Sequence, residues 1–250
     1  MKGARQWWLV ALLLGGGGAW AEEIDHERQY RACMALTHRE PMAAFESALA
    51  WEAVGGGAPA RHCAALALLE AGQHDRAAQR LEALAAELPA EYRPSPGDIM
   101  AQAANVWLLG RRPERARQAI DLALQYDPDV AHYLVDRARI LAELGDHAAA
   151  LADLDRAVAL DPDDADAATF RASALRHLGR PTEALAAAGR ALALNPDNPS
   201  AWLERGIIRQ ALGDVPGARA DWLKTASDFG GTPAARAAQA RLQALDLERR

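Results

Sequence analysis

The side chains best able to do chemistry in this chain are seven histidines, two cysteines and several paired carboxylates. The histidines are scattered, and His38, His74, His147 and His177 fall near predicted turns between helices, where polar residues are common. The sequence contains no phosphate-binding glycine loop, no HExxH and no GxSxG. We therefore predict a protein that is not an enzyme and that binds no cofactor and no metal.

Paired carboxylates such as Asp153 and Asp155 are the strongest argument for an enzyme. Two carboxyl groups about 5–10 Å apart can hydrolyse a glycosidic bond. These residues, however, lie at predicted helix starts and on solvated faces, and Asp221 recurs in register with Asp153. Helix capping and solvation account for such a repeating pattern. A role as an accessory to an envelope carbohydrate-processing enzyme remains one alternative.

The first 21 residues have the pattern of a secretory signal peptide. Lys2 and Arg5 precede an apolar run from residue 7 to residue 14, and Ala19-Trp20-Ala21 offers a cleavage site. The apolar run is too short to span a bilayer comfortably. We expect cleavage after Ala21, a periplasmic or secreted protein, and no stable membrane insertion after cleavage.

The two cysteines, Cys33 and Cys63, lie 30 residues apart. An even pair in an exported protein predicts a disulfide, which would stabilise the fold by roughly 3–4 kcal/mol on the chain-entropy account. The alternative is two buried free thiols, which pack as small apolar side chains. Zinc would need about four clustered ligands, and His62 beside Cys63 is a single neighbour.

Composition favours helices and excludes one class of partner. Alanine, the best helix former, dominates, and aromatic residues make up only 6% of the chain. The net charge is −6, and no basic face is clustered as nucleic-acid binding requires. We predict an all-α protein that does not bind nucleic acid.

One segment recurs at a step of 34 residues. Apolar residues spaced by three and four predict a helix from about residue 131 to 144, which Gly145 ends, and a second helix from 148 to 159. Asp161 is expected to cap the next helix, with Pro162 in its first turn. The landmarks Gly145, Ala150, Ala157 and Pro162 return as Gly179, Ala184, Ala191 and Pro196. Such a unit cannot bury its apolar face alone, so copies must stack.

These spacings resemble the tetratricopeptide repeat family, whose units combine small residues, a central glycine and a closing proline at fixed positions. The resemblance covers four repeats in residues 97–232. Residues 22–96 are interpreted as divergent N-terminal repeats that carry the disulfide, and residues 233–250 as a C-terminal capping helix. The resemblance implies a right-handed superhelical solenoid of about six antiparallel helix hairpins, with Cys33 and Cys63 on neighbouring first helices.

The resemblance also implies that the first helix of each repeat lines a concave groove. Some members of the family clamp a terminal carboxylate there with lysine and asparagine. Asn105 fits one such position, but the companion lysines are absent. The residues that the family pattern places in the groove are Asn105, His132, Arg139, Glu143, Ser173, Arg176, His177, Leu203, Ile207 and Gln210.

An arginine recurs at the same repeat position as Arg137, Arg171 and Arg205. One interpretation is a basic ladder for an acidic partner. The other is a long side chain packed between helices, with its head paired to a carboxylate such as Asp153 or Asp221.

The function predicted from the sequence is a non-catalytic scaffold in a Gram-negative-type cell envelope. It would bind a partner protein or a peptide in its groove. A self-associating structural array is a further alternative, and the oligomeric state stays open.

Overall fold

The computed structural model describes residues 25–247, and the predicted signal peptide, residues 1–21, lies outside them. This part of the chain forms thirteen α-helices and one short π-helix, with no strand. The helices are α1 (His26–Thr37), α2 (Pro41–Trp51), η1 (Glu52–Gly56), α3 (Gly57–Glu70), α4 (His74–Glu87), α5 (Pro96–Leu109), α6 (Pro113–Tyr126), α7 (Ala131–Glu143), α8 (His147–Leu160), α9 (Ala165–His177), α10 (Pro181–Leu194), α11 (Pro199–Ala211), α12 (Val215–Asp228) and α13 (Pro233–Leu247).

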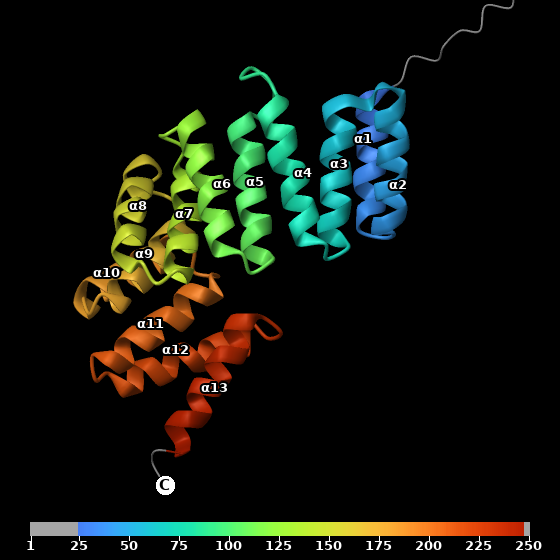
Figure 1. Ribbon diagram of the computed structural model, residues 1–250. Helices are drawn as coiled ribbons and strands as arrows, with labels where there is room; N and C mark the ends of the chain where they lie inside the picture. Colours follow the sequence, from blue (N-terminus) through green and yellow to red (C-terminus); the bar gives the residue numbers. More distant parts are fainter. Residues whose placement is uncertain (1–24, 248–250) are drawn as a thin grey trace, which may run out of the picture.

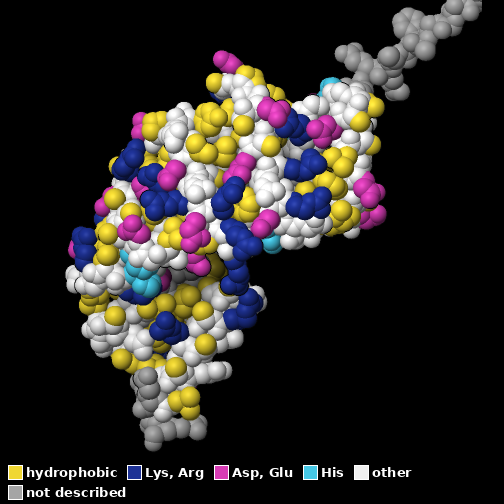
Figure 2. Space-filling view, viewed as in Figure 1, with side chains coloured by type: hydrophobic (Ala, Val, Ile, Leu, Met, Phe, Trp, Pro, Cys, Tyr) yellow, Lys and Arg dark blue, Asp and Glu magenta, His cyan; other side chains and the backbone are white. Residues whose placement is uncertain are grey.

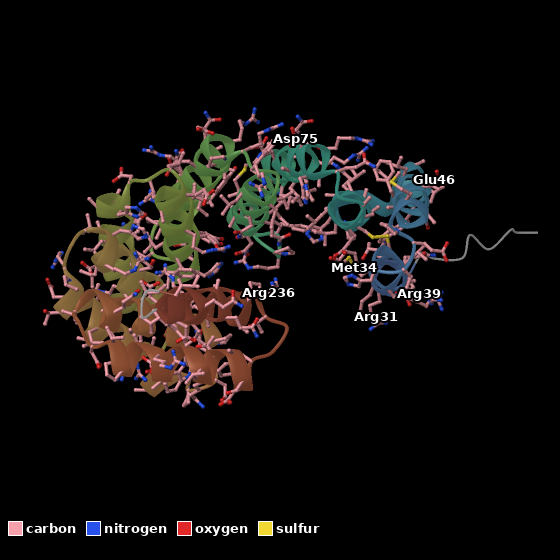
Figure 3. The ribbon with its side chains drawn as sticks, turned by 90° about the horizontal axis from the view of Figure 1, so that it is seen from below. Arg31, Met34, Arg39, Glu46, Asp75 and Arg236 are labelled. Carbon is pink, nitrogen blue, oxygen red and sulfur yellow. A yellow bond between two sulfur atoms is a disulfide. The ribbon has the colours of Figure 1, made fainter. Side chains whose placement is uncertain are left out.

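Consecutive helices pair into six antiparallel hairpins, and each hairpin stacks on the next (Figure 1). The first helices of the hairpins are α1, α3, α5, α7, α9 and α11. Seen along the stack, the hairpins curve into an open arc, with Arg31 of α1 near one end and Arg236 of α13 near the other (Figure 3). The all-α solenoid predicted from the 34-residue period is confirmed.

Local chemistry sets the helix ends at the repeat spacing. Asp146, Asp164 and Asp214 cap α8, α9 and α12, because the side chain of each accepts a backbone N–H of the first turn. The expectation that Asp161 caps the next helix is wrong. Asp161 instead ends α8, and the chain turns through Pro162 before Asp164 begins α9.

Alanines let the paired helices approach closely. One alanine recurs with no exposed surface in the second helices of the last four hairpins, and the set is Ala116, Ala150, Ala184 and Ala218. A larger side chain there would push the two helices of a hairpin apart. The small residues that reveal the repeat in the sequence are therefore the contact points of its core.

The two ends of the solenoid are held differently. At the N-terminal end a disulfide joins Cys33 of α1 to Cys63 of α3, whose Cα atoms are 6.3 Å apart. At the C-terminal end, the Thr232 hydroxyl accepts the Ala235 N–H at 3.1 Å and starts α13. Ala238 and Leu245 of α13 then pack with the buried Trp222 of α12 and cover the last hairpin.

None of the helices described is long and apolar enough to cross a membrane. Within residues 25–247, no three His, Cys, Asp or Glu side chains are grouped as a metal ion would require.

Candidate partner-binding groove

Side chains tie most neighbouring first helices together along the concave face. At the N-terminal end, the Tyr30 hydroxyl lies 2.7 Å from His62 Nδ1, and His62 Nε2 lies 2.8 Å from Gln102 Oε1. This chain of contacts links α1, α3 and α5. Burial lowers the pKa of His62, which keeps the imidazole neutral at pH 7.

The same kind of link joins α5 to α7 and α9 to α11. Asn105 Nδ2 donates to Asp136 at 2.8 Å, and the Tyr133 hydroxyl donates to Asp98 at 2.7 Å. Farther along the stack, Arg176 Nε donates to Glu204 at 2.6 Å. Each of these contacts bridges the first helices of adjacent hairpins.

The junction between α7 and α9 differs from the others. No side-chain hydrogen bond joins these two helices in the described chain, although the Arg139 guanidinium lies 5.7 Å from the centre of the Phe170 ring. A cavity of about 770 Å³ opens here. Figure 2 shows the molecule hollowed between the middle repeats and the C-terminal helices, with Lys and Arg side chains gathered along the margin.

The cavity combines an apolar interior with a polar edge. Its apolar lining comes from α5 to α9 and comprises Leu108, Pro113, Ala138, Ala142, Ala150, Leu154, Phe170 and Ala174. Its polar lining comprises Arg111, Arg139, Glu143, His147, Ser173 and His177. An apolar pocket with a few polar groups at its edge is the usual form of a recognition site.

Two histidines from different repeats meet at this edge. The rings of His147 and His177 stack with their centroids 4.1 Å apart and 15° between their planes. Burial lowers the pKa of His177, and the neighbouring Arg176 and His147 lower it further. His147 Nδ1 is buried and has no hydrogen-bond partner among the described residues. The lowered pKa keeps the His177 imidazole neutral at pH 7, so His177 presents a neutral aromatic face to His147.

The structure brings four of the ten predicted groove residues into the cavity lining: Arg139, Glu143, Ser173 and His177. Asn105 and Arg176 contact Arg139 and Ser173 and so lie beside the cavity. His132 lies farther along the face, with Nε2 4.0 Å from Asp98.

The three predicted groove residues of α11 lie elsewhere. Leu203 and Ile207 pack with Ala238 and Leu245 of α13. Gln210 is half-buried and does not line the cavity. Because the C-terminal helix packs on this apolar part of α11, the open stretch of the groove lies nearer the middle of the chain.

The cavity residues that were missed from the sequence include Arg111, His147 and Phe170. Gly110 stands one place earlier than the other turn glycines, which puts Arg111 at the glycine position of its repeat. His147 begins a second helix, and His177 ends the first helix of the next repeat, so their proximity follows from the stacking. Aligning the repeats by their 34-residue register could have identified Arg111 and the proximity of His147 to His177.

A second, smaller hollow of about 260 Å³ lies at the N-terminal end, between the starts of α1, α3 and α5. Tyr30, His62, Tyr92 and Pro94 contribute to its lining, which is mostly apolar. Tyr92 and Pro94 belong to the connection between α4 and α5, which interrupts the 34-residue spacing.

The recurring arginines are held by carboxylates. Arg137 pairs with Asp153 and Arg205 with Asp221, both with N–O distances of 2.7 Å. Arg171 pairs instead with Asp155, at 2.6 Å. These cations are therefore satisfied within the chain, as the second interpretation of their repeat predicted.

Comparison with known proteins agrees with this architecture. Two family models described as tetratricopeptide repeat match residues 109–174 and 166–208. The solved structure of Pseudomonas aeruginosa PilF is 14% identical, with a TM-score of 0.66, and the match covers 86% of this chain and 97% of PilF. MamA from Desulfovibrio magneticus RS-1 is 18% identical, with a TM-score of 0.58 over 67% of this chain and 92% of MamA. No curated protein sequence matches the chain.

Residues 109–208 therefore carry tetratricopeptide repeats, and the described chain as a whole has the fold of tetratricopeptide repeat proteins. At these identities the two solved structures show the fold alone. The fold supports a protein–protein interaction scaffold.

Proposed function

We propose that this protein is a non-catalytic scaffold of the cell envelope that binds an extended segment of a partner protein in the groove between α7 and α9. The observation that carries the proposal is the cavity of about 770 Å³ at this junction. Side-chain hydrogen bonds bridge the other junctions between first helices in the described chain, whereas none bridges α7 and α9, and the cavity at this junction has an apolar floor. A solenoid presents such a surface without the convergent catalytic groups that an enzyme needs.

The chemistry of the lining supports a peptide as the ligand. Leu154 and Phe170 offer apolar contact, while Ser173 and Arg139 offer a hydroxyl and a cation at the edge. A peptide carries both kinds of group on neighbouring residues, and an extended one can follow a groove between parallel helices.

The envelope location rests on two observations. Residues 1–21 have the signal-peptide pattern, and Cys33 is joined to Cys63 in a disulfide, a bond that persists in oxidising compartments. Osmotic-shock fractionation followed by N-terminal sequencing tests this part. We expect a periplasmic protein that begins at Glu22. A cytoplasmic protein that keeps Met1 would contradict it.

Site-specific photocrosslinking in the native cell tests the groove. Ala142 is exposed and lines the cavity, whereas Ala152 is exposed on α8 and does not. Benzoylphenylalanine at position 142 should give a discrete adduct with a second protein, and position 152 should not. Ser173→Trp should abolish the adduct, because the indole fills the cavity.

The outcomes separate the candidate functions. An adduct from position 142 that survives Ser173→Trp would contradict the groove. An adduct of two copies of this chain would favour the self-associating array. Ala152→Trp controls for the effect of adding an exposed indole.

A further inference from the structure

The turn between α5 and α6 has an arginine where the turns of the other hairpins between α3 and α12 have a glycine. The equivalent residues Gly72, Gly145, Gly179 and Gly213 have φ between 70° and 85°. Arg111 takes their place with φ of 57° and has the only positive φ of any non-glycine residue among those described. A side chain in this left-handed region is strained, since its Cβ crowds the backbone.

The glycine of this turn stands one residue earlier. A Cβ on Gly110 would lie 3.0 Å from His74 Cβ and 3.3 Å from Asp75 Oδ1, so a side chain there would force α4 to shift by a few tenths of an ångström. This explains why glycine occupies position 110. It does not explain an arginine at position 111, where a second glycine would remove the strain.

Within the described chain, Arg111 makes no ion pair that would offset the strain of its backbone conformation. Its side chain is exposed, lines the cavity and makes no ion pair with any residue from 25 to 247. The neighbouring cations are all engaged: Arg112 with Asp75 at 3.4 Å, Arg139 with Asp136 at 3.1 Å, and Arg176 with Glu204 at 2.6 Å. Arg111 is thus the cation at this edge that is free to accept an outside carboxylate.

We infer that Arg111 is a specificity-determining residue of the groove, which binds a partner peptide carrying a bulky apolar side chain next to a single acidic residue. The inference rests on the proposed function and names the chemistry of the ligand. The apolar side chain would enter the floor formed by Leu108, Leu154 and Phe170. The acidic side chain would pair with the Arg111 guanidinium, whose planar fork suits a carboxylate.

Glu143 should limit the number of acidic residues that a bound peptide can carry. It lines the same cavity and makes no ion pair with another described residue. A second carboxylate at its end of the cavity would be repelled, because like charges placed together are unfavourable. The groove should therefore prefer one acidic residue beside an apolar one over a run of acidic residues.

Peptide selection against the purified, oxidised protein tests this. The probe is a random ten-residue display library, from which one enriched peptide is synthesised. We expect enriched peptides to pair Leu, Phe, Ile or Met with a neighbouring Asp or Glu. Arg111→Gly should weaken the synthetic peptide about tenfold or more and remove its preference for Asp over Asn. Glu143→Gln should relax the discrimination against a second acidic residue.

If Arg111 had a purely structural role, Arg111→Gly would lower the melting temperature. The proposal predicts the opposite: Arg111→Gly should raise the melting temperature by roughly 2–4 °C, because glycine adopts the left-handed turn without strain. The same variant would then be more stable and bind less well. Arg112→Gly is the matched control: it removes the adjacent exposed cation, which does not line the cavity, and should leave peptide affinity unchanged.

The remaining outcomes distinguish two failures. Peptides that lose binding on Ser173→Trp, yet show no acidic preference and bind Arg111→Gly normally, would overturn the role of Arg111 and leave the groove intact. A library that yields no binder, or only binders indifferent to Ser173→Trp, would overturn the groove and Arg111 together.

Discussion

The repeat at residues 131–164 and the repeat at residues 165–198 share almost all their small residues but hold a recurring arginine in different ways. In the first, Arg137 of α7 pairs with Asp153 of α8, sixteen residues later in its own hairpin. In the second, residue 187 at that spacing is alanine. Arg171 of α9 reaches back sixteen residues to Asp155, which belongs to α8 of the preceding hairpin.

The repeat at residues 199–232 repeats the first arrangement, since Arg205 pairs with Asp221 inside its own hairpin. The repeat at 97–130 has alanine at both positions, Ala103 and Ala119. The arginine–aspartate pair is thus present in some hairpins and absent from others. Where the hairpin lacks the aspartate, Arg171 pairs with a carboxylate of the preceding hairpin. The carboxylate side chain is 7% exposed at Asp153, 3% at Asp221 and 51% at Asp155, so these three pairs should differ widely in stability.

Asp221→Ala should have the largest effect of the set. Asp221 receives hydrogen bonds from both Arg205 and Arg209. Its removal leaves the partly buried Arg205 without a carboxylate and leaves Arg209 with only Asp214, at 3.7 Å. Breaking such a buried pair costs about 3–5 kcal/mol, and we expect the upper part of that range. Urea unfolding followed by circular dichroism would measure it. A loss below about 1 kcal/mol would contradict the assignment of Asp221 as a structural anchor.

Asp153→Ala should cost less, about 3 kcal/mol, because Arg137 keeps a second acceptor. Arg137 Nη1 also donates to Asp121 at 3.1 Å, so the cation is not left wholly unpaired. The same urea measurement applies, with Asp121→Ala as a comparison that leaves the Asp153 pair intact. If Asp121→Ala costs more than Asp153→Ala, the ranking of the two acceptors is wrong.

Ala187→Asp restores the missing carboxylate and tests the spacing directly. Ala187 is 5% exposed, so an aspartate there needs Arg171 as its partner. We expect the substitution to be tolerated within about 1 kcal/mol when Arg171 is present, and to cost about 3 kcal/mol in an Arg171→Ala background. A double-mutant cycle would then give a coupling of about 2 kcal/mol. Additive effects would show that this hairpin cannot reproduce the arrangement of its neighbours.

Most of the fold could be predicted from the sequence because its constraints are local and repeated. Gly145 and Gly179 end helices by a positive φ, and Ala150 and Ala184 mark close helix contacts, so each repeat reports the same geometry independently. The wrongly predicted cap of α9 shows the limit of prediction from such local features. Asp161 and Asp164 both suit the role, and the backbone conformation between them decides which one begins α9.

The site was harder to predict because it depends on differences between repeats. The family pattern places Ile207 and Ser173 at the same repeat position, yet α13 packs against the first and the second lines an open cavity. Which stretch of the groove stays open is decided by contacts between distant helices. The stacked rings of His147 and His177 likewise depend on how one hairpin sits on the next.

Asp155→Ala should have the smallest effect, at most about 1 kcal/mol, because half of the Asp155 side chain is exposed and water screens its attraction to Arg171. Salt sharpens the contrast with Asp153. In 1 M NaCl the difference between Asp155→Ala and the wild type should vanish, whereas the loss caused by Asp153→Ala should persist, since screening acts mainly on exposed charges. Urea unfolding of both variants at low and high salt measures this. Equal losses at both positions would mean that pairing within a hairpin and pairing between hairpins are energetically alike, and that exposure does not separate them.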